Sequence, residues 1–166
     1  MDTGLLVARM VLGLLIAAHG AQKLFGWFGG YGLAGTGGFF EQLGFRPGRF
    51  FAATAGTTEV VGGLLVASGL LGPLGPALII SVMVVAMATV HWQHGLFAQN
   101  NGIETPLLYA VGAMALALVG PGAYSLDAIF SLYWSSEVAW IAIVLGVLAG
   151  VANLAIRKTG AEAAHV

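Results

Sequence analysis

Five apolar stretches dominate this chain, and all but the short fourth one are close to the length of about 20 residues that crosses a bilayer core as a helix. They cover residues 4–23, 50–71, 74–94, 106–120 and 138–156. Hydrophobic residues make up 58% of the 166 positions and charged residues 8%, whereas about a quarter of the residues in a soluble domain are charged. The sequence therefore predicts an all-helical protein that crosses a membrane several times.

The small number of charges and the absence of cysteine exclude several classes of function. The formal net charge is −1, and the six Lys and Arg residues form no patch that would bind nucleic acid. Without cysteine, the chain has no disulfide, no thiolate-bound iron–sulfur cluster and no reactive thiol. Any redox chemistry would need a bound cofactor or a partner protein.

The positions of Lys and Arg predict the orientation in a cytoplasmic (inner) membrane. Lys23, Arg46 and Arg49 lie between the first two apolar stretches, and Arg157 and Lys158 follow the fifth. With five crossings, both groups fall on the same side, which the positive-inside rule makes cytoplasmic. We therefore expect the N-terminus outside and the C-terminus in the cytoplasm.

Ionisable residues inside the apolar stretches are the main candidates for a functional site, because a charge in hydrocarbon is costly unless it is paired, hydrated or used in chemistry. In the first stretch, Arg9 lies with Gly13 and Gly20 on one helical face, and His19 and Lys23 lie at its edge. Arg9 can be interpreted as a residue that snorkels to the interface or as an inward-facing partner of an acid.

Glu59 is the acid that best fits such a partnership. It lies on a face of the second stretch that also carries Gly56, Gly62 and Gly63, and small residues let two membrane helices approach closely. We predict that Arg9 and Glu59 lie in the bundle interior within reach of an ion pair or a single bridging water. The alternative is that the glycines serve packing alone and that Glu59 is a protonated core residue.

A weaker candidate site ends the third stretch. Met83, Met87, His91 and His94 recur at helical spacing, and Met and His both bind copper and haem iron. Methionine at this spacing is usually core filling, and a His pair around Trp92 is equally typical of the membrane interface. Haem or metal is therefore not the favoured interpretation, and His91 and His94 stay weak candidates.

The segment 26–45 is rich in glycine and aromatic residues, including Trp27, and has a single acid, Glu41. This composition predicts an irregular or re-entrant segment that folds back onto the membrane face over the polar residues. Such a segment could cap a quinone-sized cavity or serve only as an interfacial anchor.

Four motifs in order resemble the DoxX family of small bacterial and archaeal membrane proteins. They are Arg9 with Gly13, HGAQKLFGWFGGYGLAGTGGFF (19–40), EVVGGLLVASGLL (59–71) and GPGAYSLD (120–127). The resemblance implies a DoxX-like four-helix membrane domain over residues 1–127. Residues 128–166 would then add a transmembrane helix and a short polar tail. It also implies Arg9, His19, Lys23 and Glu59 as the polar residues of the family pattern.

The family takes its name from a subunit of an archaeal thiosulfate:quinone oxidoreductase, and mycobacterial relatives are linked to a membrane oxidoreductase complex for oxidative and thiol stress. The resemblance therefore implies a membrane subunit of a quinone-linked redox system. In this hypothesis Arg9, Lys23 and Trp27 bind an anionic group or quinone, and Glu59 and His19 exchange protons with it.

Two alternative functions stay open, and the sequence does not specify the partners. The chain could be a non-catalytic scaffold that recruits a soluble oxidoreductase, or a transporter of protons or small solutes. The expected partners are the lipid bilayer, a second membrane subunit or a soluble oxidoreductase, and a second copy of the chain. Lipid extraction and optical spectra of the purified protein would separate the redox hypothesis from the scaffold.

Overall fold

The computed structural model describes residues 2–158, and this part of the chain is helical without strands. Its long elements are α1 (Asp2–Phe25), α3 (Gly48–Ser68), α4 (Leu74–Ala86), α5 (Glu104–Val119) and α7 (Ser136–Ala155). Its short elements are η1 (Trp27–Gly29), α2 (Gly32–Gln42), η2 (Met87–His91), η3 (Trp92–His94), η4 (Ala98–Asn100) and α6 (Leu126–Ile129). The π-turn η2 and the 3₁₀ turn η3 prolong α4, so that one continuous helical rod covers Leu74–His94.

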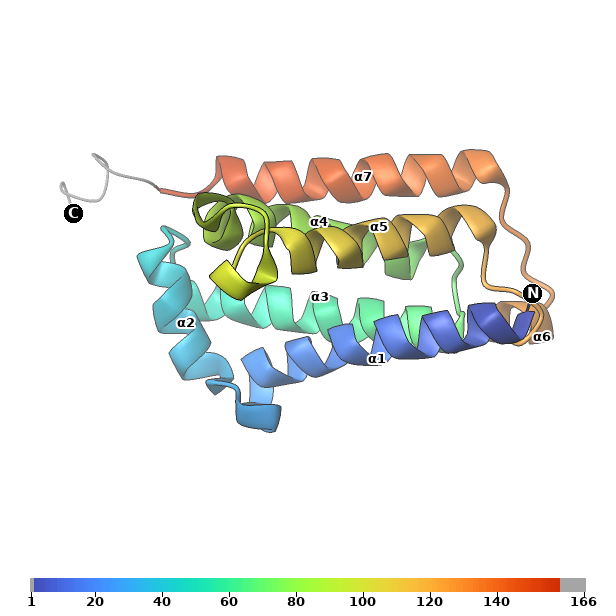
Figure 1. The fold of residues 1–166 in the computed structure, drawn as a ribbon, viewed down its shortest axis with the longest axis horizontal. Coiled ribbons are helices and arrows are strands. Elements are labelled where there is room, and N and C mark those ends of the chain that lie inside the picture. Colours follow the sequence, from blue (N-terminus) through green and yellow to red (C-terminus); the bar gives the residue numbers. More distant parts are fainter. Residues whose placement is uncertain (1, 159–166) are drawn as a thin grey trace.

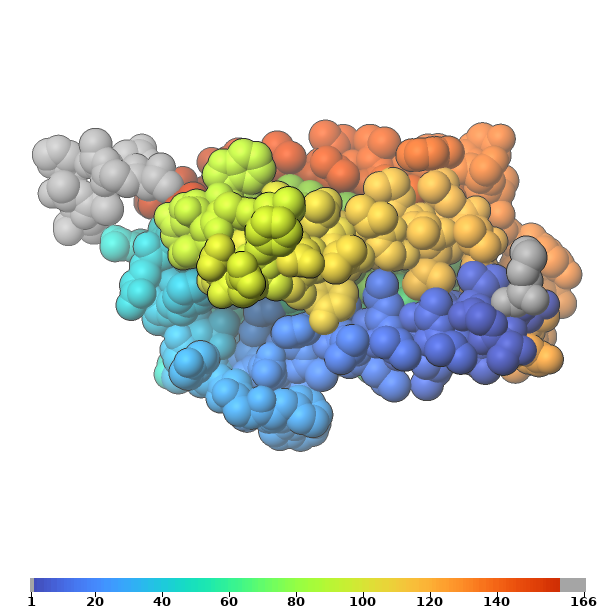
Figure 2. All heavy atoms as spheres, in the orientation of Figure 1, coloured from blue at the N-terminus to red at the C-terminus, as the bar shows by residue number. Residues whose placement is uncertain are grey.

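The long helices lie side by side and alternate in direction along the molecule (Figure 1). At one end, called the α2 end here, α2 crosses the bundle and η2 to η4 cluster beside it. At the other, the α6 end, the start of α1 meets the α3–α4 turn and α6. In the space-filling view, α1 and α5 lie in contact along one face of the bundle (Figure 2).

The expected all-helical membrane fold is confirmed. Four helical rods in the described chain are long and apolar enough to cross a membrane: Asp2–Phe25, Gly48–Ser68, Leu74–His94 and Ser136–Ala155. The remaining expected span, 106–120, is also a helix, but α5 has only 16 residues. Because α5 lies alongside the others (Figure 1), it belongs to the same bundle despite its length.

Glycines set the closest contact in the bundle, between α1 and α3. A Cβ atom on Gly13 would lie 2.4 Å from the backbone oxygen of Gly63, and one on Gly20 would lie 2.5 Å from that of Gly56. The two helices therefore touch backbone to backbone, as the glycine faces predict. This contact brings the polar residues of α1 and α3 toward one another.

The apolar core lies between the helices, and the outer surface is also apolar. Buried residues of α1, α3, α4, α5 and α7 form one cluster that includes Ile16, Ile79, Ala113 and Ile143. Many large apolar side chains are nevertheless exposed on the helix surfaces, as expected where lipid rather than water is the solvent. Gly146 of α7 packs against Ala77 of α4, so the last helix is part of this packing.

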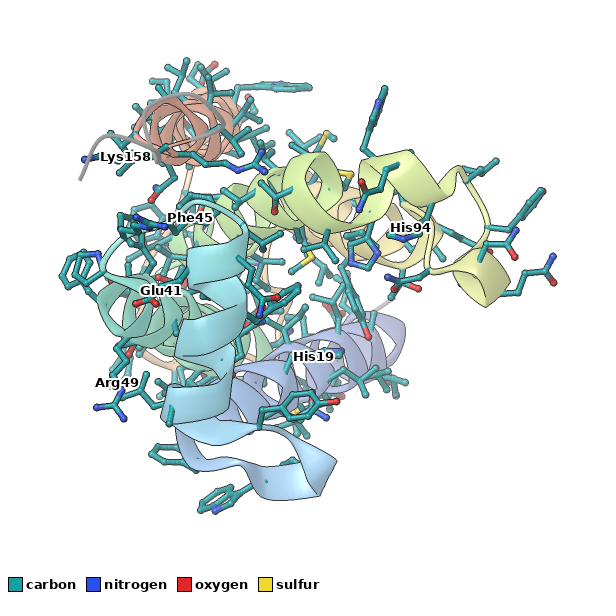
Figure 3. All side chains as sticks on the ribbon, turned by 90° about the vertical axis from the view of Figure 1, so that its left-hand side faces the viewer. His19, Glu41, Phe45, Arg49, His94 and Lys158 are labelled. Atoms are coloured by element: carbon teal, nitrogen blue, oxygen red, sulfur yellow. The ribbon has the colours of Figure 1, made fainter. Side chains whose placement is uncertain are left out.

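The 26–45 segment folds differently from the expectation. It is not irregular, because the turn η1 and the eleven-residue helix α2 occupy most of it. The segment does cover the polar residues at this end, since α2 packs across α1 and α3 (Figure 3) and lines the open cleft with Lys23. A Cβ atom on Gly37 would lie 2.9 Å from the Arg49 side chain, which shows how closely α2 and α3 approach.

Candidate functional site

The buried charges separate into two clusters at opposite ends of the bundle. Arg9 and Asp127 lie at the α6 end, and Glu59 lies with Lys23 toward the α2 end. Both clusters bring together residues that are far apart in the sequence. They differ in the groups that satisfy each charge.

Arg9 is fully enclosed and donates its hydrogen bonds to backbone carbonyls. One guanidinium nitrogen donates to the carbonyl of Ala67 at 3.1 Å, and another donates to the carbonyl of Tyr124. Ala67 lies in the last turn of α3, where carbonyl groups lack helical partners and the helix dipole favours a cation. Arg9 therefore ties α1 to the end of α3 and to the segment before α6.

Asp127 holds the same end of the bundle from the other side. Its carboxylate accepts hydrogen bonds from the amides of Leu71 and Gly72 at 2.8 and 2.7 Å, and from the indole of Trp134 at 2.8 Å. Its own amide donates to the carbonyl of Gly69, which has a φ of 64° that favours glycine. Asp127 thus fixes the α3–α4 turn and the approach to α7.

The predicted ion pair between Arg9 and Glu59 is wrong. Glu59 pairs with Lys23, and both carboxylate oxygens accept hydrogen bonds from the Lys23 ammonium group. Arg9 instead bonds to Ala67, which lies eight residues beyond Glu59 and therefore about 12 Å farther along α3. The error arose because Arg9 and Lys23 share one helical face, and periodicity does not specify height along the helix.

The Lys23–Glu59 pair lies where α1 ends and α3 is still in mid-helix. Lys23 is in the last turn of α1, and Glu59 lies between Gly56 and Gly62 on the contact face of α3. The Glu59 side chain is 2% exposed and that of Lys23 is 27% exposed. The carboxylate is therefore withdrawn from solvent, whereas the ammonium group keeps partial access to it.

Two hollows meet at Lys23. The first, called the aromatic cavity, has a volume of about 270 Å³ and is enclosed by α2, α3, the α4 rod and α7. Its aromatic lining consists of Phe39, Phe40, Phe45 and Phe51. The second, called the open cleft, has a volume of about 630 Å³ and lies between α1 and the η1–α2 segment. Lys23, Thr36 and Phe39 line both hollows.

His19 lies in the open cleft, one helical turn before Lys23. Its ring packs edge-on against Tyr109 of α5, with ring centroids 5.8 Å apart. In the end-on view His19 lies on one side of α2, opposite Glu41 and Arg49 (Figure 3). The structure therefore brings together His19, Lys23 and Glu59, and leaves Arg9 in a separate cluster.

The histidines at the end of the α4 rod do not form a ligand cluster. The π-turn η2 changes the helical register before His91. His91 lines the aromatic cavity and donates from Nδ1 to the carbonyl of Asn101 at 2.7 Å. His94 is exposed and donates to the carbonyl of Val90 at 2.9 Å. Within residues 2–158, no three His, Asp or Glu side chains group as metal ligands would.

Trp27 lies outside both hollows. Its side chain is part of an exposed aromatic group with Phe25 and Phe28, and Trp27 is 59% exposed. Exposed aromatic residues beside the end of a membrane helix are typical of an interfacial anchor. The structure thus places Trp27 on the exposed surface of η1 and not in the candidate site.

Sequence reasoning missed most of the uncharged residues that line the aromatic cavity. Thr36 and Phe39 come from α2, Thr58 from α3 and Asn153 from α7. Thr58 directly precedes Glu59, which is a signal that could have been used. Asn153 offered the clearest missed signal. A polar amide side chain inside an apolar stretch long enough to cross a membrane is costly and therefore needs an explanation.

Comparison with known proteins assigns the family. The family model described as DoxX matches residues 4–92, which include Lys23 and Glu59. The chain belongs to the DoxX family. It is 31% identical over 136 residues to the inner membrane protein YqjF of Escherichia coli, an alignment that covers 80% of this chain and 96% of that protein.

A second relative extends the comparison without naming an activity. The chain is 29% identical over 129 residues to the uncharacterized membrane protein Rv3486 of Mycobacterium tuberculosis, covering 72% of this chain and 76% of the relative. No solved structure matches significantly. The resemblance predicted from the four motifs is therefore confirmed at the level of the family and of a multi-pass membrane protein.

Proposed function

We propose that this DoxX-family protein is the membrane subunit of a quinone-linked redox system, and that the aromatic cavity binds the quinone head group. The observation that supports this most directly is that Lys23 lines both the aromatic cavity and the open cleft and pairs with the buried Glu59. Quinone oxygens need a hydrogen-bond donor and a source of protons, and this pair offers both beside a flat apolar surface.

The lining of the aromatic cavity fits a single ring better than a large ligand. Its volume of about 270 Å³ is near the lower end of the roughly 300–1,000 Å³ of small-molecule sites. Several polar residues of the wall are already satisfied within their own helices, because the hydroxyls of Thr54 and Thr89 donate to carbonyls four residues earlier. Lys23 is then the charged contact available to a ring, beside the polar side chains of Thr36, Thr58 and His91.

The chain's own residues would manage protons and leave electrons to a partner. Reduction of a quinone to a quinol takes up two electrons and two protons. A soluble oxidoreductase would supply the electrons. Lys23 would donate a hydrogen bond to the ring oxygen. The two protons would pass one after the other from water in the open cleft through the Lys23–Glu59 pair to the ring oxygens. The open cleft, which His19 and Gln22 also line, would connect the pair to water.

The charge distribution supports a cytoplasmic partner. Arg46, Arg49, Arg157 and Lys158 flank the α2 end, together with Lys23. In the orientation that the positive-inside rule favours, this end faces the cytoplasm. A soluble oxidoreductase docked there would deliver electrons next to the aromatic cavity, either in the oxidation of thiosulfate or a related sulfur compound or in oxidative-stress defence.

The test compares quinone retention and turnover in matched variants. Lys23→Met and Glu59→Gln should each lose co-purifying quinone and quinone-coupled turnover in membranes that contain the partner. Glu137→Gln, at the exposed start of α7, serves as the control and should match the wild type. Retention of quinone and turnover in both site variants would reject the proposal.

The scaffold hypothesis remains the second candidate, and the direct Lys23–Glu59 salt bridge favours it. A structural pair would make stability, and not turnover alone, depend on both residues. The same preparations distinguish the two functions. Loss of turnover with retained thermal stability supports the redox site, whereas parallel losses of stability and activity support the scaffold.

A further inference from the structure

A shallow groove on the lipid-facing side of α3 adjoins the aromatic cavity. Its volume is about 490 Å³. It is lined by Phe50, Ala53, Thr54, Thr57, Thr58 and Val61 of α3 and by Leu78 of α4. Thr54 and Thr58 also line the aromatic cavity. The two hollows therefore share one wall, and the mechanism described above leaves the groove without a role.

We propose that this groove holds the hydrocarbon tail of the ligand whose head group occupies the aromatic cavity, and that the ligand enters laterally from the bilayer. The inference rests on the proposed function and adds that the substrate is a tailed, membrane-dissolved quinone. Thr54 and Thr58 line both hollows, so the head group and the tail of the ligand would join beside these two residues.

The chemistry of the groove suits a tail. Its lining has no charged residue. Thr54 donates its hydroxyl to the carbonyl of Phe50 at 2.9 Å, which removes its polar hydrogen from the surface. Ala53 is small, and Thr54, Thr57 and Thr58 are much smaller than Phe50, so α3 is hollowed beside Phe50. Gly62 lets α3 and α4 pack closely at the base of the groove, since a Cβ atom there would lie 3.1 Å from the Leu78 side chain.

The test fills the groove without touching the head-group cavity. Ala53 lines the groove but not the aromatic cavity, and Ala53→Trp should exclude the tail. Ala115→Trp, on the exposed surface of α5, is the matched control. Affinities are measured in detergent for a long-tailed quinone and for a quinone with the same ring and no tail, and a thermal melt checks that each variant is folded.

We expect Ala53→Trp to weaken binding of the tailed quinone by about tenfold, the effect of displacing roughly two buried methylene groups. Affinity for the tail-free quinone should be unchanged, and the control should bind both like the wild type. A second variant, Thr57→Phe, should act in the same direction, so the result does not depend on the folding of one protein.

Four results would overturn the inference. Equal weakening of both quinones, or unchanged binding of the tailed one, would remove the tail from the groove and leave the proposed function standing. Loss of co-purifying phospholipid in Ala53→Trp with unchanged quinone affinity would identify a lipid chain as the occupant. If the wild type binds neither quinone, the proposed function fails, and the groove assignment fails with it.

Discussion

The two buried charge clusters of this protein use opposite means to keep charge inside a membrane bundle. At the α6 end, Arg9 and Asp127 bond mainly to the backbone of turns and helix ends. Toward the α2 end, Lys23 and Glu59 bond to each other, and Lys23 lines both hollows. A charge bonded mainly to fixed backbone groups holds a fold together, whereas a side-chain pair beside a cavity can exchange partners with a ligand.

This comparison shows that burial alone does not identify a functional charge. Asp127 is 0% exposed and accepts three hydrogen bonds, so little of its carboxylate remains for a substrate. Lys23 is less buried, yet it is the residue that both hollows share. The variants that follow test the contrast, from the largest expected effect to the smallest.

Asp127→Asn should cause the largest loss of stability. The asparagine side chain keeps one acceptor oxygen but turns an NH₂ group toward backbone or indole donors, so at least one charge-assisted hydrogen bond is lost and one donor is left unpaired. We expect the free energy of unfolding to fall by about 3 kcal/mol, as measured by denaturation in detergent.

Asp2→Asn is the matched control for that experiment. Asp2 accepts one hydrogen bond from Ala123 near the same end of the bundle, at a more exposed position. Its effect should be well below that of Asp127→Asn. Similar stabilities for the two variants would show that the Asp127 cluster does not hold the fold, which would break the comparison between the two ends.

Gly20→Ala should affect both stability and ligand binding. The new methyl group would lie 2.5 Å from the backbone oxygen of Gly56, so α1 and α3 must separate beside the Lys23–Glu59 pair. Overpacking of this kind costs about 1–3 kcal/mol. Gly4→Ala is the control, since a Cβ atom there meets nothing within 4 Å. Equal melting temperatures for the two variants would contradict the close helix contact.

A double-mutant cycle on Lys23 and Glu59 should give a smaller stability effect but a complete loss of function. Because Lys23 is partly exposed, we expect a coupling energy of about 1 kcal/mol. Lys23→Met combined with Glu59→Gln should recover most of the stability that either single change loses.

The double variant then separates chemistry from structure. It should still lack quinone-coupled turnover, because neither remaining side chain can exchange a proton. Turnover that returns together with stability would assign the pair a structural role, and the two ends of the bundle would no longer differ in kind.

Trp27→Ala should have the smallest effect on the folded protein. Its side chain is outside both hollows, so quinone affinity should stay unchanged and the free energy of unfolding should change by no more than about 0.5 kcal/mol. Binding measured by tryptophan-independent methods, such as retention of extracted quinone, provides the check. A clear loss of affinity would extend the binding site to η1.

The sequence alone predicted the features that depend on residue spacing within one helix. Apolar length located the spans to within a few residues, and the glycines of α1 and α3 indicated the faces that meet. The glycine and aromatic content of 26–45 indicated the membrane interface, but not helix α2. Six glycines lie between positions 29 and 38, and such a run lowers helix propensity. Packing against α1 and α3 overrides that preference.

By itself, the sequence determined that this is a multi-pass helical membrane protein of the DoxX family with costly charges in its spans. Apolar length and motif order are local properties, and local properties suffice for that conclusion. Only the tertiary structure decided that Glu59 faces Lys23 and not Arg9. The partner of a buried charge depends on how far one helix slides along another, and that offset follows from the packing of Gly13 on Gly63 and Gly20 on Gly56.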